Sequence, residues 1–533
     1  MRSSRLSLGV VSIVCCAIAV GAVQQHSIGW NEASHYAQVR AIDHGTPIID
    51  RYQRTTGDKA YFEHHYYSDK APGLAFLTLP AYHVLRAAGI TRLIPTVHML
   101  VLFGCLLPAV AMMLAAYWLV QRRDPGLGTV VALTLGLATL ILPFATLYFS
   151  HVLSASLGFL AFCLLWLERE RGTNLALVAG AGALVGYGVS TEYPLALLAV
   201  LLGVYALWRE APLKAGLAYG TGLFVGLLPL LLYDWWAFGS PFHLSYSYVA
   251  ANSSGVLGLG APSLRRAVEL LVADRGLLVV TPVVAAGFAG LVILYREGRR
   301  RDALMPAAVV AGYIAYNACY YLPFGGGVPG PRFLITMLPF LAVPLAAAYR
   351  KAPIATLSLA LVSAMIMVLA TLTGPVLATS QSTHTWWLRL RLGHFRTPVV
   401  TVWLFGLFAM LAIAAAARAT PRPRVSRIDL GLAVLGLGGW YAISRVGPAL
   451  LHSDLSSGHI SGLIALLAIG IALAAIITRT AMGNLLAVLA GIPVVALAVR
   501  SFDHAPLTLV LAAVSVGLLV VLSLTNARRR MLL

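Results

Sequence analysis

The chain has little charge, and acidic residues are its scarcest polar class. Only 11% of its 533 residues are charged, and 19 acidic residues stand against 38 basic ones. Soluble globular domains carry roughly 25% charged residues, so this composition excludes a water-soluble globule with one buried core. Hydrophobic residues make up 59% of the chain, which is typical of a polytopic bundle of membrane-spanning helices.

Cysteines are also few, and several chemical signatures are missing. All five cysteines lie inside apolar runs, where thiols pack as small hydrophobic groups. This excludes a disulfide-linked outer domain, and we do not expect the protein to use cysteine redox chemistry. No glycine-rich stretch ends in the Gly-Lys-Ser/Thr of a P-loop, and no fixed-period repeat or low-complexity segment stands out. We therefore expect no nucleotide site and no cofactor.

Apolar runs long enough to cross a hydrocarbon layer of roughly 30 Å recur along the whole chain. Hydropathy identifies about sixteen of them. Several are short or joined by two or three residues, so about twelve to sixteen spans is the expected range, with merged or re-entrant pairs among them. The runs are 6–23, 94–120, 128–149, 152–167, 175–190, 193–208, 217–238, 276–295, 304–321, 333–348, 354–373, 399–417, 428–443, 460–478, 485–499 and 507–524.

Basic residues near the span ends separate into two sets, which predicts the orientation. Cytoplasmic loops of membrane proteins carry the excess of Lys and Arg. We therefore predict that both termini are inside and that the first loop, 24–93, is on the extracytoplasmic side. Arg greatly outnumbers Lys, and Ala, Leu, Val and Gly are abundant, which indicates a high-GC bacterium and hence a bacterial cytoplasmic membrane. The cytoplasmic set comprises Arg2, Arg5, Arg122, Arg123, Arg169, Arg171, Arg296, Arg299, Arg300, Arg301, Arg350, Lys351, Arg418, Arg422, Arg424, Arg427 and Arg528 to Arg530.

The net charge of +19 does not indicate nucleic-acid binding. The basic residues are spread over many short loops beside the spans, whereas nucleic-acid binding requires a continuous groove or stripe. Membrane topology and contact with anionic lipids explain the charge. We expect membrane lipids as partners and no nucleic acid.

One long polar segment, residues 30–73, interrupts the apolar sequence. It mixes acids, bases and tyrosines within about forty residues. Carboxylates accept protons from hydroxyl groups, fixed cations hold phosphate, and aromatic faces stack on sugar rings. The alternative is an ordinary solvated outer loop. The apolar stretch that follows, 72–85, is too short to cross and is expected in the interface, where it can line a lipid entrance.

Outside this segment, three charged residues near span ends are candidate ligands. Glu192 and Asp234 are costly at membrane depth and therefore candidate functional groups, although a helix-end acid exposed to headgroup water is an equal alternative. Arg332 follows a Gly/Pro-rich loop and offers a fork suited to phosphate. The fourteen histidines show no His-x-x-x-His ligand spacing backed by an acid, so we predict no metal site.

Several motifs resemble one enzyme family. WNEASHY starts the polar segment at residue 30, GTPIID covers 45–50, TGDKA covers 56–60 and HYYSDKAPG covers 65–73. Further on, YDWWAFGSPF covers 233–242 and GPRFL covers 330–334. Together they resemble the polyprenyl-phosphate-sugar-dependent membrane glycosyltransferases of the GT-C fold, of the protein O-mannosyltransferase and aminoarabinose transferase type (glycosyltransferase family 39). The likeness is greatest to uncharacterised bacterial members.

The resemblance implies an all-α fold and a division of the chain. It implies a GT-C-like catalytic module over residues 1–350, which includes the first outer loop with its short juxtamembrane helices, and additional C-terminal helices over 351–533. It also implies transfer of a sugar from a polyprenyl-phosphate donor to a hydroxyl group of a glycan, lipid or protein acceptor. The absence of an Asp-x-Asp pair speaks against the metal-dependent branch of this fold.

By the same resemblance, loop carboxylates and cations form the site. Asn31 stands where the family often has its first acid, so Glu32 ranks first as the base, and Asp50, Asp58 and Asp69 compete with it. A transporter or flippase for a lipid-linked saccharide is the alternative; it predicts charges at mid-membrane and related halves, which the sequence lacks. The expected substrate-binding residues are Lys59, Tyr66, Tyr67, Lys70, Glu192, Asp234 and Arg332.

Overall fold

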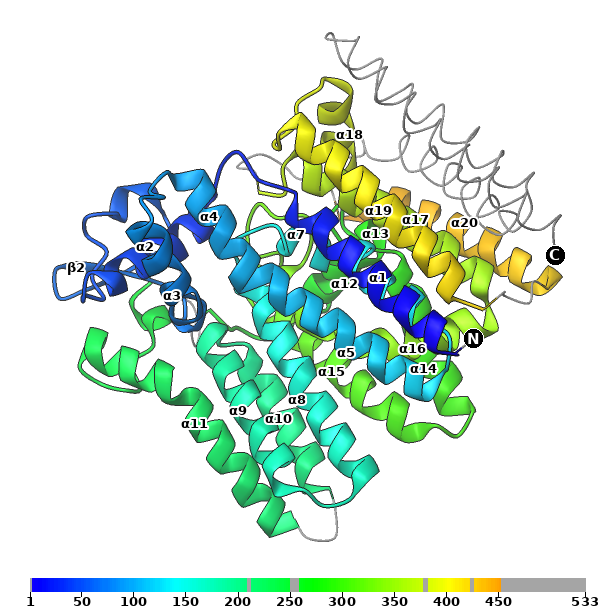
Figure 1. The fold of residues 1–533 in the computed structure, drawn as a ribbon, viewed down its shortest axis with the longest axis horizontal. Helices are drawn as coiled ribbons and strands as arrows, with labels where there is room; N and C mark the ends of the chain where they lie inside the picture. Colours follow the sequence, from blue (N-terminus) through cyan, green and yellow to red (C-terminus); the bar gives the residue numbers. More distant parts are fainter. Residues whose placement is uncertain (1, 209–211, 250–257, 377–381, 422–425, 452–533) are drawn as a thin grey trace.

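The computed structural model describes residues 2–208, 212–249, 258–376, 382–421 and 426–451. Three of the predicted spans, 460–478, 485–499 and 507–524, lie outside the described residues. Figure 1 shows a bundle of long helices, with the first polar segment projecting from one end of it.

The described part of the chain is almost entirely helical. Seven helices are long and apolar enough to cross a membrane, or eight if one bent pair counts as a single span, and shorter apolar helices accompany them. The protein is therefore a multi-pass, all-α membrane protein, which confirms the predicted fold class. The spans are Leu93–Arg123, His151–Arg171, Pro212–Phe238, Arg332–Lys351, Pro353–Thr373, Val399–Ala419 and Arg427–Leu450.

The elements follow one another closely along the chain, and most connections are short. In the first half they are α1 (Arg2–Gly21), α2 (Trp30–Asp43), η1 (Gln53–Thr55), β1 (Lys59–Phe62), β2 (His65–Ser68), α3 (Gly73–Ala87), α4 (Leu93–Val101), η2 (Leu102–Leu106), α5 (Leu107–Arg123), α6 (Gly128–Leu137), α7 (Ile141–Phe144), α8 (His151–Arg171), α9 (Leu175–Thr191), α10 (Leu195–Leu207) and α11 (Pro212–Phe238). In the second half they are η3 (Ser245–Tyr248), α12 (Leu264–Val272), α13 (Leu277–Val280), α14 (Val283–Arg296), α15 (Arg300–Cys319), η5 (Arg332–Leu341), α16 (Ala342–Lys351), α17 (Pro353–Thr373), α18 (Thr383–Arg391), α19 (Val399–Ala419) and α20 (Arg427–Leu450).

Two of the predicted spans are broken in the structure. The run 128–149 is a ten-residue helix, α6, followed by the single turn α7. Pro143 lies in that turn and lacks the N–H that a continuing helix needs. The run 276–295 is interrupted at Pro282, and the segment α12–α13 is bent by 96° from α14. Hydropathy alone cannot detect such breaks, because the broken segments are as apolar as intact spans.

Basic residues that the sequence places on one side converge at one end of the bundle. Arg123 forms a salt bridge with Asp302 at 2.8 Å. Asp124 forms salt bridges with Arg299 at 3.0 Å and with Arg350 at 3.1 Å. These bridges join the ends of α5, α15 and α16. Arg123, Arg299 and Arg350 of the predicted same-side set are therefore grouped in space, at the end of the bundle that we call the basic end.

The polar segment lies at the opposite end. Helix α8 has its His151 terminus at this end and its Arg171 terminus at the basic end, where Glu170 contacts Arg123 at 3.6 Å. Its 21 residues rise by about 30 Å at 1.5 Å per residue, which matches the thickness of a hydrocarbon layer. The polar segment is a packed unit of α2, η1 and the β1–β2 hairpin, with α3 following it (Figure 1).

The C-terminal helices are packed onto the N-terminal ones. Helix α19 runs along α1 (Figure 1), and the Ser12 hydroxyl donates to the carbonyl of Ala412 at 2.7 Å. Near the polar end, Gln25 donates to the carbonyl of Thr371 at 3.1 Å. The division at residue 350 stays a prediction about function, and helices on both sides of it share one hydrophobic core.

Candidate active site

Lys70 lies at the centre of a buried group of charges. Its ammonium group contacts Asp58 at 2.9 Å and Asp69 at 3.1 Å, and the residue is only 7% exposed. The hairpin brings these residues together, because Lys59 of β1 pairs with Ser68 of β2. Asp58 precedes β1 and Asp69 follows β2, so both acids lie at the same open end of the hairpin.

The charges of this group stabilise one another. Burial acts to lower the pKa of Lys70, but the attraction of Asp69 and Asp58 outweighs it and raises the pKa. Burial acts to raise the pKa of Asp58, and the neighbouring Lys70 outweighs it and lowers the pKa. For Asp69, burial dominates and the pKa is raised. Lys70 is therefore a permanent cation that two carboxylates hold in place.

Arg332 lies in the same electrostatic field, although 262 residues separate it from Lys70. Its positive charge acts on Lys70, Asp58 and Asp69. The guanidinium carbon lies 5.8 Å from the ring centre of Phe149 and 5.1 Å from that of Phe333. A Cβ on Gly325 would lie 2.3 Å from Nε of Arg332, so only glycine allows this approach.

The Nε of Arg332 is buried and lacks a hydrogen-bond partner among the described residues. Aromatic rings hold the guanidinium group, and the salt bridges of the described part of the chain do not include it. A fixed guanidinium group with unused donors is a suitable ligand for a phosphate oxygen.

A chain of hydrogen bonds lies beside these cations. His151 Nδ1 contacts Glu192 at 2.8 Å, and the Ser150 hydroxyl donates to the same Glu192 oxygen. Ser150 also contacts His35 Nε2 at 3.3 Å. Burial acts to raise the pKa of Glu192, but His151 and Ser150 lower it to about 2. Burial, followed by the charge of Lys70, lowers the pKa of His35 to about 3. Glu192 is therefore ionised and His35 is neutral at pH 7.

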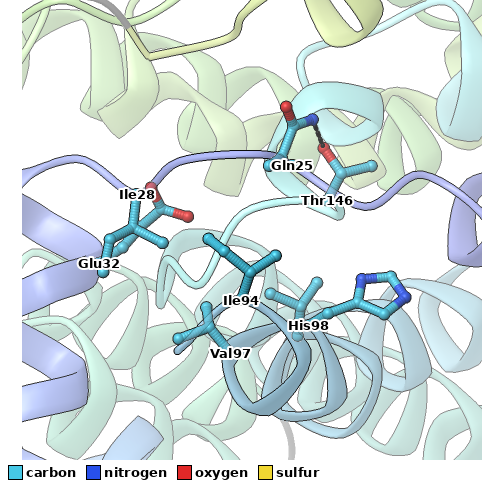
Figure 2. Close-up of a pocket in the computed structure, with 8 residues that line it drawn as sticks. Gln25, Ile28, Glu32, Ile94, Val97, His98 and Thr146 are labelled. Carbon is cyan, nitrogen blue, oxygen red and sulfur yellow. Dashed lines mark hydrogen bonds between the residues drawn. The ribbon is translucent and has the colours of Figure 1, made fainter. Parts of the chain in front are cut away.

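Glu32, which the sequence ranks first as a base, lies elsewhere. One of its oxygens accepts the backbone N–H of Gly29 at 2.8 Å and the other accepts that of Tyr148 at 3.2 Å. Burial raises its pKa to about 7. Glu32 lies beside a cavity of about 10 Å³, the space of roughly one water molecule. The view of this cavity is given in Figure 2. The other lining residues are Gln25, Ile28, Ile94, Val97, His98, Val101 and Thr146.

The remaining predicted residues of the first loop support the hairpin. Asp50 accepts the N–H of Tyr66 at 2.6 Å and contacts His65 at 2.7 Å. Lys59 donates to the carbonyl of Gln53 at 2.9 Å and lies 4.6 Å from the ring centre of Tyr66. These contacts fix the hairpin that carries Asp58 and Asp69.

Tyr67 and Asp234 lie on the helix side of the hairpin. The Tyr67 ring packs 5.0 Å from that of Phe238 in α11. Asp234, also in α11, is fully buried, and both of its oxygens lack hydrogen-bond partners within the described residues. The structure thus brings Asp58, Asp69, Lys70, Glu192 and Arg332 together. Asp50 and Lys59 support the hairpin, and Glu32 lies outside the group.

The roles of His35, Ser150 and His151 are not predicted from the sequence. The available signal was the dipeptide Ser150-His151 at the junction of two apolar runs, since polar side chains at a break between spans lie at the membrane surface. Among the described residues, no three His, Cys, Asp or Glu side chains are grouped as metal ligands. A larger hollow of about 480 Å³ lies between α2 and α3, lined by Ile42, Asp43, Leu79, Pro80, His83 and Val84.

Comparisons with known proteins find likenesses of structure. The chain is similar to ArnT from Cupriavidus metallidurans bound to undecaprenyl phosphate, with 15% identity and a TM-score of 0.49 over 89% of this chain and 80% of that chain. The apo form of that protein gives 14% identity and a TM-score of 0.44 over 88% and 79% of the two chains.

The archaeal oligosaccharyltransferase AglB from Archaeoglobus fulgidus, in complex with an inhibitory peptide and a dolichol-phosphate, is similar over 79% of this chain. It gives 12% identity and a TM-score of 0.44, and the match covers 56% of AglB. No family model matches the sequence, and no curated protein matches it. A function for this chain therefore has to come from its own site.

Proposed function

We propose that the protein is a membrane glycosyltransferase that moves a sugar from a polyprenyl-phosphate donor to an acceptor hydroxyl group at the extracytoplasmic face. The observation that carries this proposal is the pair of cations at the membrane end opposite the basic end: Lys70, which is buried, and Arg332, which is half-buried with a buried Nε. A phosphate leaving group needs fixed positive charge where its negative charge develops. The first-loop motifs support the same reaction by resemblance.

The geometry suits a lipid-borne phosphate. Lys70 offers a compact ammonium group, and Arg332 offers a planar fork with an unused Nε donor. Both lie near the His151 terminus of α8, where a span begins, so a headgroup held there keeps its lipid tail in the bilayer. Soluble phosphates would not require a site at this depth.

The two acids beside Lys70 have a separate role in this proposal. Asp58 and Asp69 hold the ammonium group and keep it charged despite its burial. Without them, an isolated buried lysine loses its proton readily.

The direct experiment incubates the purified protein with a panel of labelled polyprenyl-phosphate hexoses and pentoses and measures release of polyprenyl phosphate. Release that depends on the sugar carried by the donor is the expected result. A protein that binds polyprenyl phosphate yet releases it from no donor in the panel, while moving a labelled lipid-linked saccharide between leaflets, is a flippase.

Arg332→Lys tests the phosphate role. We expect a higher KM for the donor and a lower kcat, because an ammonium group cannot reproduce a bidentate fork. The combined loss is expected to be about tenfold to a hundredfold, the range for one charge-assisted hydrogen bond. Arg54→Lys is the matched control, since Arg54 is an exposed residue of the same outer segment. Equal kinetics in the two variants would refute the assignment.

A further inference from the structure

Two imidazole nitrogens beside the cation pair are buried and have no partner among the described residues. They are Nδ1 of His35 and Nε2 of His151. Both rings belong to the hydrogen-bonded chain His35–Ser150–Glu192–His151, and each uses its other nitrogen in that chain. A neutral imidazole has one donor and one acceptor nitrogen, so the chain determines which nitrogen carries the proton.

The direction of the chain follows from Glu192, which can only accept when it is ionised. His151 therefore donates from Nδ1, and its Nε2 carries a free lone pair. Ser150 donates its proton to Glu192, so His35 donates from Nε2 to the Ser150 oxygen. A proton on Nε2 of His151 would be a buried donor without a partner, which costs about 1–3 kcal/mol. The neutral form with an open acceptor is favoured.

The two rings differ in basicity. His151 is bonded directly to a carboxylate, and such a partner raises the basicity of an imidazole and fixes its orientation. His35 is bonded only to a hydroxyl group, and burial with the charge of Lys70 lowers its pKa to about 3. Of the two rings, His151 is the one whose protonated form has a direct anionic partner.

The carboxylates of the first loop are already in use. Glu32 gives both oxygens to backbone N–H groups. One oxygen of Asp50 accepts the backbone N–H of Tyr66, and the other contacts the ring Nδ1 of His65. Asp69 contacts Lys70 through both oxygens, and Asp58 holds the same ammonium group. These contacts orient the loop carboxylates toward other groups, whereas the Nε2 of His151 has no hydrogen-bond partner among the described residues.

His151 also lies beside the proposed phosphate ligands. The charges that face it are Glu192, Arg332 and Lys70. Its ring lies 5.5 Å from that of Phe333, the residue after Arg332. The rings of Phe144 and Phe149 cover its other sides at 5.7 Å and 5.9 Å. The base is therefore next to the cations, within a largely apolar wall.

We propose that His151, oriented by Glu192, is the general base that receives the proton of the acceptor hydroxyl group. This inference rests on the proposed function. In the step, the acceptor O–H bond breaks and its proton passes to Nε2 of His151. The acceptor oxygen forms a bond to the anomeric carbon, and the bond from that carbon to the phosphate oxygen breaks. The electron pair leaves with the phosphate, which Lys70 and Arg332 hold.

The test compares kcat and KM in His151→Gln, Glu192→Gln and Asp58→Asn with the active donor and acceptor. Loss of a general base lowers rates by about 10²–10⁴, so His151→Gln should lower kcat at least a hundredfold while the donor KM changes by less than about threefold. His26→Gln is the matched control, because His26 is an exposed histidine of the link between α1 and α2; it should match the wild type.

The pH profile separates chemistry from structure. In the wild type kcat should fall on the acid side as the base becomes protonated. Glu192→Gln should lower the maximum rate and move this acid limb to lower pH, because an imidazole without an anionic partner is a weaker base. A purely structural role would lower the amount of folded protein and leave the limb in place. The proposal is overturned if the acid side of the kcat–pH profile is unchanged in Glu192→Gln. It is also overturned if this acid side disappears only in Asp58→Asn.

A second measurement works without turnover. Nitrogen-15 spectra of histidine-labelled protein in lipid nanodiscs should show His151 protonated at Nδ1 and bare at Nε2 at pH 7, and Glu192→Gln should abolish this preference. A protonated Nε2 in the wild type overturns the inference. If the spectra agree and no polyprenyl-phosphate sugar reacts, the proposed function fails and the base assignment for this reaction fails with it.

Discussion

Glu32 illustrates at the residue scale how burial links a carboxyl group to stability. Its pKa rises from 4.5 to about 7 because the group is buried. The folded protein therefore keeps a proton on Glu32 that the unfolded chain releases above pH 4.5. The stabilising contribution of this group is fully present below pH 4.5 and is lost as the pH rises through about 7.

Glu32→Gln should make stability less dependent on pH, because the amide does not titrate. Between pH 5 and pH 8 we expect the thermal midpoint of the wild type to fall more steeply than that of the variant, as measured in detergent by tryptophan fluorescence. The variant should also be less stable at every pH, since one backbone N–H faces an amide NH₂ instead of an oxygen. Parallel pH curves would show that Glu32 does not carry this dependence.

The burial of Glu32 is also a property that the sequence does not indicate. Burial of the loop acids could not be predicted, because a polar segment of this composition is ordinarily solvated. Lys70 was identified by the resemblance of its motif, and Arg332 by the Gly/Pro-rich loop that it follows. The proximity of Ser150, His151 and Glu192 depends on how α8 packs against α9, and no spacing in the sequence indicates that packing.

At the scale of elements, α9 and α11 are positioned by glycines in pairs four residues apart. A Cβ on Gly222 would lie 1.9 Å from the carbonyl oxygen of Ala179, and a Cβ on Gly226 would lie 2.2 Å from that of Ala183. Small residues at this spacing let two helix backbones approach closely within a membrane. The pair matters for the site because α9 ends one residue before Glu192 and α11 carries Asp234.

Gly222→Leu should force the two helices apart and displace Glu192. We expect a much lower yield of folded protein, and in the surviving fraction a loss of turnover of at least tenfold. Gly220→Leu is the control on the same helix, since nothing lies within 4 Å of a Cβ at that position. Size-exclusion profiles and single-turnover rates measure the two effects. Equal behaviour of both variants would show that close packing here is not required.

Hydropathy did not predict that helix α2 is a buried part of the fold. The sequence predicts short juxtamembrane helices in the first loop, and the structure has 14 residues of helix here, most of them buried. The burial of α2 could not be predicted from hydropathy, because the helix contains few apolar residues. Polar residues such as Ser34 and Gln38 are inside because they have partners there: Ser34 contacts Ser68 at 2.8 Å, and Gln38 donates to the carbonyl of Lys70 at 3.1 Å.

At the scale of the whole molecule, the basic end and the hairpin end should face opposite compartments. The positive-inside rule places the basic end in the cytoplasm. We expect a cysteine at position 54, which is exposed in the first loop, to react with an impermeant maleimide in intact cells. A cysteine at position 301, exposed at the basic end, should react only after permeabilisation. The reverse pattern would overturn the orientation and with it the proposed extracytoplasmic reaction.

The all-α membrane class follows from composition, and the two broken spans do not. The grouping of basic residues could be predicted because it depends only on alternation of spans. The internal bridges between Asp124, Arg299 and Arg350 could not, since pairing depends on which helix ends are neighbours. Arg299 therefore joins the end of α5 to the start of α15 through its salt bridges with Asp124 and Asp302, although its position in a loop of the sequence does not indicate this.

The packing of α1 along α19 has a consequence for biosynthesis. Helix α1 leaves the ribosome before α19 does, and its partner surface, including the carbonyl to which Ser12 donates, follows 400 residues later. At roughly 5–20 residues per second of synthesis, α1 waits about 20 to 80 seconds beside lipid before α19 is made. During that interval the Ser12 hydroxyl faces hydrocarbon or a neighbouring helix. The insertion machinery and the order of translation are thus part of how this chain reaches its fold.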